Sequence, residues 1–409
     1  MQILNKLWSF ARLFLLAKKV WRRPTPVDIV MIDPTGLDVL EPYLRAWSID
    51  VIHIEGDQLS IPVLWQCVVK RKLNVAGYID QFIQITQPRL VLTFLDNNHY
   101  LYPISSRHSR TNTMFIQNGY RGYYSDVFEY LANRSRSGDV WTIDYMATFG
   151  PNVGREFARH LSGRVVPIGS LKNNMVARTP ITDKNVIAVI SQYRNTDSIE
   201  LNGRCFTFDE YFLAIDKIIF SVLMDYVENH GKEIVIVQRY SNDTEKLNKE
   251  REYFSMLAGD RCRFSVPEWH DSSYIALDKA EITVVVDSTL GYESLARGNK
   301  TAFFSARGTM LDLDDRTFGW PAVLGDDGPF WTNRPDPEAL RRIIDHLFEI
   351  DDRAWSDEVR SHAYDDIMIY DPGNTKLRAL FDDALAADGS GNTEPPGGNA
   401  SEALATHTG

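Results

Sequence analysis

The segment "VVVDSTLGYESLARG" places small polar and acidic side chains directly after an apolar run. Asp287, Ser288 and Thr289 follow a predicted strand, and Gly291 and Glu293 fall in the first turns of a predicted helix. The free N–H groups and the positive dipole end at a helix start attract anions, and glycine lets a backbone approach a ligand. These residue types predict a phosphate site, with Glu293 placed to accept a hydrogen bond from a ribose hydroxyl.

The same residues have a purely structural explanation. Asp, Ser and Thr are favoured at helix N-caps, and Glu in a first turn is favourable without any ligand. No GxxxxGK[ST] occurs, which excludes P-loop chemistry, and no GxGxxG follows the first strand, which argues against a standard dinucleotide fold. Both the capping and the phosphate-binding interpretations stay open.

Further polar clusters follow other predicted strands. In the first half of the chain they are Asp33, Thr35 and Gly36 in "IDPTG"; Asp96, Asn97, Asn98 and His99 in "TFLDNNHY"; and Gln117, Asn118, Gly119 and Arg121 in "FIQNGYRG". In the second half, "ISQYR" and "VQRYS" end strands in the same way, the latter with Gln238 and Arg239. Each cluster alone is explained by a turn. Together they predict a polyhydroxylated, phosphorylated ligand, because amides, acids and arginines pair with hydroxyls and phosphates.

His270, in "VPEWHDSSY", precedes another predicted helix. Its imidazole can donate to a phosphate or to a developing charge, and the alternative is a loop histidine that caps the helix. No metal-ligand spacing such as HExxH stands out, and we interpret the acids of "DLDD" as a solvated turn. The sequence therefore predicts no metal site.

The elements that must position these residues alternate between short β-branched runs and helical stretches. Nearly continuous apolar strands separated by helices indicate parallel sheets covered on both faces, and the polar stretch "LKNNMVARTPITDKN" divides them. The predicted fold class is α/β, with two Rossmann-like domains facing across a cleft. The expected organisation is a basic amphipathic helix (1–24), an N-terminal Rossmann-like acceptor-side domain (25–175), a C-terminal Rossmann-like donor domain (184–350), C-terminal helices (351–387) and a disordered tail (388–409).

The composition of the chain argues against several classes of function. The chain has 409 residues and a formal net charge of -11, which argues against a nucleic-acid partner. Three scattered cysteines predict neither a disulfide framework nor a zinc site, and they fit a cytoplasmic setting. Residues 1–24 are basic and apolar but too short and too charged to span a bilayer. They predict either peripheral contact with the inner membrane or packing on the protein's own surface.

Several motifs resemble a family of bacterial surface-carbohydrate and O-antigen biosynthesis proteins. They are "VDIVMIDPTG", "TFLDNN", "FIQNGYRG", "IGSLKNN", "DSTLGYESLARGNKTAFFS" and "IMIYDPGN". This resemblance implies a glycosyltransferase-like protein of the GT-B architecture, which usually works without a bound metal ion. It also implies that Ser288 and Thr289 hold the donor phosphate. Where similar sialyltransferase-like groups carry a His-Pro element, this sequence has Gln238 and Arg239, which argues against a CMP-linked donor.

We therefore expect transfer of a sugar from a nucleotide-sugar, used as substrate with no other cofactor, to a lipid-linked or oligosaccharide acceptor. Arg239 would neutralise phosphate, and in an inverting reaction Asp96 is the first choice of base, followed by Asp33 and His99. The expected pathway is surface polysaccharide biosynthesis, such as O-antigen, lipopolysaccharide or capsule. The alternatives are a nucleotide-sugar epimerase of the same fold, or a non-catalytic scaffold or polysaccharide-binding protein.

Overall fold

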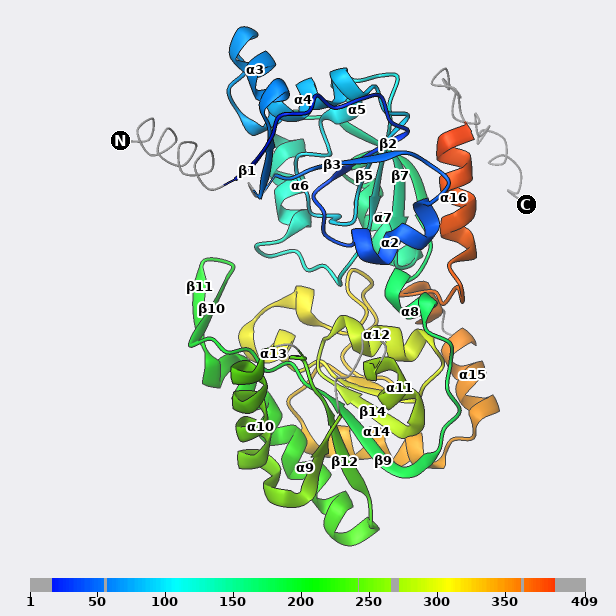
Figure 1. The fold of residues 1–409 in the computed structure, drawn as a ribbon. Helices are drawn as coiled ribbons and strands as arrows, with labels where there is room; N and C mark the ends of the chain where they lie inside the picture. Colours follow the sequence, from blue (N-terminus) through cyan, green and yellow to red (C-terminus); the bar gives the residue numbers. More distant parts are fainter. Residues whose placement is uncertain (1–16, 55–56, 242, 266–271, 362–363, 387–409) are drawn as a thin grey trace, which may run out of the picture.

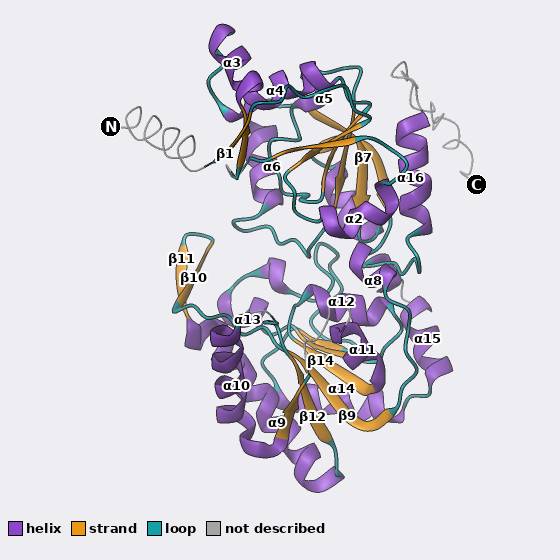
Figure 2. Cartoon of the chain, in the orientation of Figure 1, coloured by secondary structure: helices purple, strands orange, loops and turns teal. Residues whose placement is uncertain are grey.

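Two six-stranded parallel sheets form the centre of the molecule, one in each half of the chain (Figures 1 and 2). The computed structural model describes residues 17–54, 57–241, 243–265, 272–361 and 364–386. In spatial order, the first sheet consists of β3 (Ile49–Ile52), β2 (Ile29–Ile32), β5 (Leu90–Thr93), β6 (Asn112–Ile116), β7 (Trp141–Thr148) and β8 (Leu161–Pro167). The second consists of β13 (Cys262–Phe264), β12 (Glu233–Val237), β9 (Asp183–Ile190), β14 (Ala280–Val285), β15 (Thr301–Phe304) and β16 (Trp331–Thr332).

Helices connect most of the strands, and three more α-helices of the described chain follow the last strand. The first half contains α2 (Leu37–Leu44), α3 (Ile61–Val69), α4 (Val75–Thr86), α5 (Ile104–Arg107), α6 (Val127–Arg136), α7 (Pro151–Ala158) and α8 (Leu171–Met175). The second contains α9 (Ala214–His230), α10 (Thr244–Ala258), α11 (Ser272–Lys279), α12 (Thr289–Ala296), α13 (Arg307–Leu311), α14 (Pro337–Glu349), α15 (Asp352–Ser361) and α16 (Thr375–Ala386). The prediction of two Rossmann-like domains is confirmed. No helix in the described ranges has the length and hydrophobicity to cross a membrane.

The buried strands follow the period-two pattern of a covered sheet. Ile29 and Met31 on β2 point to one face, and Val30 and Ile32 point to the other, with all four fully buried. The face with Ile29 and Met31 is covered by α2 and by α16 from the far end of the chain, whose contacting side chains are Leu377, Leu380, Phe381, Ala384 and Leu385. Figure 1 shows α16 lying along the first domain, so the chain crosses between the domains twice.

Two small sheets lie outside the main ones. β1 (Lys18–Val20) pairs in parallel with β4 (Gln58–Ser60), and β10 (Ser198–Leu201) forms a hairpin with β11 (Arg204–Thr207). The helix expected over residues 1–24 is therefore wrong at its end, because Lys18–Val20 are extended and bonded to β4. The rest of that prediction, residues 1–16, lies outside the described residues, as does the tail from 387 onward.

Arg297, at the end of α12, fastens the first crossing segment. Its guanidinium is fully buried and forms an ion pair with the buried carboxylate of Asp278. It also donates to the backbone oxygens of Asn173, Val176 and Ala177 at 3.1, 2.9 and 3.2 Å. The predicted linker is thus a bonded segment on the surface of the second domain, and it begins with α8.

Candidate functional site

The strand order of each sheet reverses at one point, and the polar clusters gather there. In the first sheet the reversal lies between β2 and β5, which are followed by Asp33 and Asp96. In the second it lies between β9 and β14, which are followed by the "SQYR" segment and Asp287. Ligands of open parallel sheets bind outside the carboxyl ends of the strands at such reversals. The candidate site is therefore the junction between these two edges.

The two edges are in direct contact at this junction. The amide of Tyr120, in the loop after β6, donates to Thr289 Oγ1 at 2.9 Å, and its ring stacks on Tyr292 of α12 with centroids 4.5 Å apart. The amides of Tyr123 and Tyr124 donate to Asp315 Oδ2 at 2.7 and 3.0 Å. The "FIQNGYRG" and "DSTLG" motifs, 169 residues apart, thus meet as neighbours.

The start of α12 uses its polar residues partly for its own structure. Ser288 is the N-cap, and its hydroxyl accepts from the amide of Leu290 at 3.4 Å. Gly291 provides close packing inside the domain, because an added Cβ would lie 2.6 Å from Cγ1 of Val285. Ser288 therefore has the capping role that the first interpretation predicts. The start of α12 also lies at the carboxyl ends of the strands, as the phosphate-binding interpretation requires.

Glu293 lies deeper than a ribose contact requires. It is buried, accepts a hydrogen bond from the Ser170 hydroxyl, and its backbone oxygen accepts from Asn173 Nδ2 at 3.3 Å. Burial raises the pKa of Glu293 to about 7 against the opposing effect of the Ser170 and Tyr274 hydroxyls. These contacts bind α12 to the end of the first domain.

Asp287 is held by an arginine that sequence reasoning missed. Arg307, at the start of α13, is buried and places Nη1 2.5 and 2.6 Å from the two Asp287 oxygens. The same nitrogen donates to Gln192 Oε1 at 2.8 Å. Burial would raise the pKa of Asp287, but the charges of Arg307 and Arg316 hold it below its usual value. Asp287 thus orients a cationic group at the strand ends.

Two further arginines make this edge positive. Arg194 follows β9 and Arg239 follows β12, and both side chains are exposed. Burial of part of the guanidinium, and then the charges of Arg239 and Arg307, lower the pKa of Arg194. Within the described ranges, neither the Arg194 nor the Arg239 side chain has a hydrogen-bond or ion-pair partner. Arg194 ends the "ISQYR" motif, so a strand-end signal for it was present in the sequence.

Glu250 of α10 supports the loops that carry these arginines. Its fully buried carboxylate accepts from the Ser191 hydroxyl and from the amide of Arg239, the latter at 2.8 Å. Gln238, the neighbour of Arg239, is buried and accepts from Arg251 Nη2 at 3.3 Å. The Arg239 side chain is exposed, while its backbone is held in place by the buried carboxylate of Glu250.

In the first domain, Asp96 is committed to Arg121. Its carboxylate is fully buried and bonds Arg121 Nε at 2.7 Å and Nη2 at 2.5 Å, while the amide of Asn118 donates to it at 3.3 Å. Arg121 Nη2 also donates to Asn118 Oδ1 at 2.6 Å. A carboxylate held in this way is poorly suited to accept a substrate proton, because protonation would break a buried ion pair.

Asp33 is bonded through only one oxygen. Its Oδ1 accepts from the amide and the hydroxyl of Thr35 at 2.9 and 2.5 Å, and no bond to its Oδ2 occurs within the described chain. Its φ of 73° is unusual for a residue other than glycine, and such strain concentrates at functional sites. Gly36 has a φ of 79° and an added Cβ would meet the Phe94 ring at 2.1 Å, so glycine is required there.

The remaining predicted residues differ in exposure. Gln117 is buried and bridges Phe149 and Gly119, donating to the Gly119 oxygen at 3.0 Å. Asn98 is buried, whereas Asn97 and His99 are exposed, and the His99 ring lies 4.2 Å from that of Tyr100. His270 lies outside the described residues.

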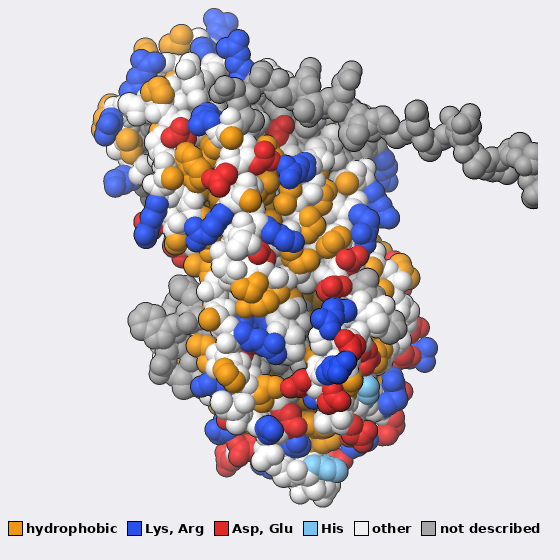
Figure 3. All heavy atoms as spheres, turned by 90° about the vertical axis from the view of Figure 1, so that its right-hand side faces the viewer, with side chains coloured by type: hydrophobic (Ala, Val, Ile, Leu, Met, Phe, Trp, Pro, Cys, Tyr) orange, Lys and Arg blue, Asp and Glu red, His pale blue; other side chains and the backbone are white. Residues whose placement is uncertain are grey.

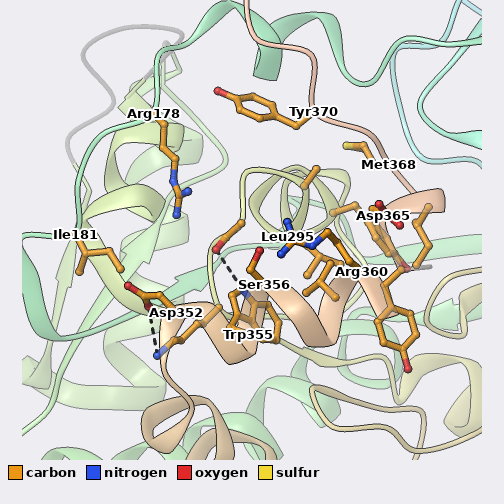
Figure 4. Close-up of a pocket in the computed structure, with 17 residues that line it drawn as sticks. Arg178, Ile181, Leu295, Asp352, Trp355, Ser356, Arg360, Asp365, Met368 and Tyr370 are labelled. Carbon is orange, nitrogen blue, oxygen red and sulfur yellow. Dashed lines mark hydrogen bonds and ion pairs between the residues drawn. The ribbon is translucent and has the colours of Figure 1, made fainter. Parts of the chain in front are cut away.

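A separate pocket of about 390 Å³ lies between α12, α15 and the two crossing segments (Figure 4). Arg178 and Tyr370 come from the crossing segments, and Trp355 from α15 donates its indole N–H to the Gly298 oxygen at 3.1 Å. No residue predicted from the sequence to bind substrate lines this pocket. It belongs to the connection between the domains.

Comparison with known proteins identifies the family of this chain. Residues 114–385 match a family described as "putative O-antigen biosynthesis protein". The chain belongs to this family. No curated protein matches it. The match begins within β6 and covers the later part of the first domain, the second domain and nearly all of α16.

The structure of this chain is similar to solved structures at low sequence identity. A "putative UDP-N-acetylglucosamine 2-epimerase" from Listeria monocytogenes is 12% identical, with a TM-score of 0.51 over 89% of this chain and 98% of that one. A glycosyltransferase from Rickettsia africae is 11% identical, with a TM-score of 0.49 over 88% and 99%. The wall teichoic acid polymerase TagF is 11% identical, with a TM-score of 0.48 over 88% and 89%. The first likeness supports the fold alone, and the architecture is GT-B.

Proposed function

We propose that this protein transfers a sugar from a nucleotide-sugar donor to a lipid-linked or oligosaccharide acceptor in bacterial surface polysaccharide biosynthesis. The observation that carries the proposal is the pair Arg194 and Arg239, two exposed arginines without partners in the described chain, which follow the neighbouring strands β9 and β12 beside the strand-order reversal of the second sheet. Guanidinium groups bind phosphate by paired hydrogen bonds, and the adjacent start of α12 adds backbone N–H groups.

On the donor side, Arg194 and Arg239 hold the donor phosphates. Ser288 and Thr289 lie at the start of α12, next to the same phosphates. As the bond between sugar C1 and the phosphate oxygen breaks, its electron pair moves to that oxygen. Fixed positive charges stabilise this growing charge without reorganisation of solvent. Asp287 and Glu250 keep the cationic edge in place through Arg307 and through the amide of Arg239.

On the acceptor side, Asp33 is the base that the geometry favours for an inverting transfer. Its free oxygen takes the proton of the acceptor hydroxyl as that oxygen bonds to C1. Asp96 then has a positioning role, holding Arg121 and the loop that contacts α12. Figure 1 shows α2, which begins just after Asp33, at the edge of the first domain that faces the second.

The test is nucleotide binding to the full chain by calorimetry, with UDP, GDP, dTDP and CMP and their sugars. Arg194→Gln with Arg239→Gln should weaken the best ligand at least tenfold and reduce the salt dependence of its binding. The matched control is Arg342→Gln with Arg353→Gln, two exposed arginines of the same domain. Unchanged affinity in the first variant would refute the assignment of the donor phosphates.

Turnover separates the proposal from its alternatives. The transferase consumes donor in proportion to added acceptor and forms a new glycosidic bond. A nucleotide-sugar epimerase converts the donor sugar with no acceptor present, and a scaffold binds without converting anything. Mass spectrometry of donor, acceptor and product under each condition distinguishes the three.

A further inference from the structure

The exposed apolar side chains of the described chain gather at one corner of the first domain. Five of the ten large hydrophobic residues that are exposed lie there: Trp21, Trp65, Val68, Val69 and Leu73. Trp65 and Val69 of α3 are each 66% exposed, and Trp21 is 75% exposed. Val20 pairs with Ser60, the residue before α3, so Trp21 lies beside the start of that helix. We call residues 18–23 and 65–73 the α3 corner.

The α3 corner is also basic. Lys70, Arg71 and Lys72 are exposed and directly follow α3, and Arg22 and Arg23 are exposed beside Trp21. The sequence contains no acid between Asp57 and Asp80. Apolar and cationic side chains therefore share one surface without a neighbouring carboxylate along α3.

A hollow of about 260 Å³ opens beside the N-terminus of α3. Arg22, Arg23 and His53 line it together with Ser60, which is 6% exposed and whose hydroxyl has no partner in the described chain. Asp50 is the one acid among its lining residues. Two arginines, an unsatisfied hydroxyl and a helix start fit a phosphate group.

The charge of the whole chain is distributed unevenly, with an excess of basic residues in the part that contains the α3 corner. Residues 1–170 contain 19 Lys and Arg against 14 Asp and Glu, whereas residues 171–409 contain 25 against 41. On the face drawn in Figure 3, Lys and Arg side chains outnumber the acidic ones over the first domain, and acidic side chains are more frequent over the second. An anionic surface would attract the first domain and repel the second.

We propose that the α3 corner docks on an anionic phospholipid bilayer. Trp21 and Trp65 suit the headgroup region, and Val68, Val69 and Leu73 suit its apolar boundary. The basic residues pair with lipid phosphates, and the hollow takes one headgroup. Figure 1 shows α3 at the end of the first domain that is remote from the second, so docking leaves the junction uncovered. This inference does not rest on the proposed transferase activity.

The test is co-sedimentation of the full chain with phosphatidylcholine vesicles that contain or lack phosphatidylglycerol. Wild type should bind the anionic vesicles, and binding should fall with salt. Trp65→Ser with Val68→Ser and Val69→Ser, and separately Lys70→Gln with Arg71→Gln and Lys72→Gln, should each weaken partitioning at least tenfold. Circular dichroism shows whether each variant folds.

The matched controls alter exposed residues elsewhere. Val140→Ser with Val323→Ser, and Lys217→Gln with Arg342→Gln and Arg353→Gln, should leave binding unchanged. Wild-type affinity in folded corner variants would overturn the proposal, because binding would then arise from another part of the chain. No wild-type binding to anionic vesicles would overturn it as well. So would a lipid-free dimer that Trp65→Ser dissociates, since the corner would then bind a second copy.

Discussion

The backbone amide of Tyr120 donates a hydrogen bond of 2.9 Å to the side-chain oxygen of Thr289, and this bond joins the two carboxyl edges of the sheets. The hydroxyl that was expected to face the donor phosphate therefore also links the domains. The stacked rings of Tyr120 and Tyr292 add an aromatic contact between the same loop and α12.

Thr289→Val tests this link. Valine has nearly the same shape but cannot accept, so the amide of Tyr120 loses its partner at a cost of about 1–3 kcal/mol in the free energy of unfolding. Thr289→Ser keeps the oxygen and should behave like wild type. Urea denaturation followed by tryptophan fluorescence measures both. Equal midpoints for the valine variant and wild type would contradict the bond.

Arg297→Met tests the anchor of the first crossing segment. The change leaves the fully buried carboxylate of Asp278 without its cation, and breaking such a pair costs about 3–5 kcal/mol. Arg297→Met with Asp278→Asn should regain part of that loss, because no uncompensated charge remains. The control is Arg360→Met, whose ion pair with Asp357 is exposed. A loss no greater than in the control would show that the anchor contributes little.

Glu293 should make stability depend on pH. Its pKa of about 7 lies above the ordinary value of 4.5. The folded state thus binds the proton more tightly than the unfolded state. The resulting stabilisation is complete below pH 4.5 and is lost as the pH rises through 7, with a magnitude on the order of 3 kcal/mol.

Glu293→Gln removes this titration and keeps an oxygen for the Ser170 hydroxyl. Its stability relative to wild type should rise between pH 5 and pH 8. Thermal unfolding of both proteins across that range measures the difference, with the exposed Glu41→Gln as the control. Parallel curves for wild type and Glu293→Gln would contradict the raised pKa.

Asp33→Asn tests the assignment of the base. Asparagine tolerates a positive φ, so the fold should be kept, while sugar transfer should fall at least about a hundredfold. Nucleotide affinity should stay within twofold, because Asp33 belongs to the other domain. Asp38→Asn, which changes an exposed acid in the first turn of α2, is the matched control. Full transfer activity in Asp33→Asn would exclude this residue as the base.

The sheets were predictable because their signal is local. Runs such as "DIVMID" and "EITVVVDS" are apolar, β-branched and followed by polar residues, and each forms a buried parallel strand. α12 was equally readable from Ser288, a favoured N-cap. The strand ends then placed the polar clusters at a common edge without further information.

The pairing of side chains was not predictable, since it depends on residues distant in sequence. The sequence alone favours Asp96 as the base and does not indicate its ion pair with Arg121, which lies 25 positions away. Arg307 lies three residues beyond the end of β15, and its ion pair with Asp287 joins residues 20 positions apart. Neither contact leaves a pattern in a single sequence.

The return of α16 to the first sheet sets an order on synthesis. The nascent first domain emerges from the ribosome with the face that carries Ile29 and Met31 only partly covered, because α16, which shares this face with α2, is the last helix of the described chain to be made. That domain can complete its core only after the second has been translated. A nascent chain arrested before residue 375 should therefore recruit chaperones that bind exposed hydrophobic surface.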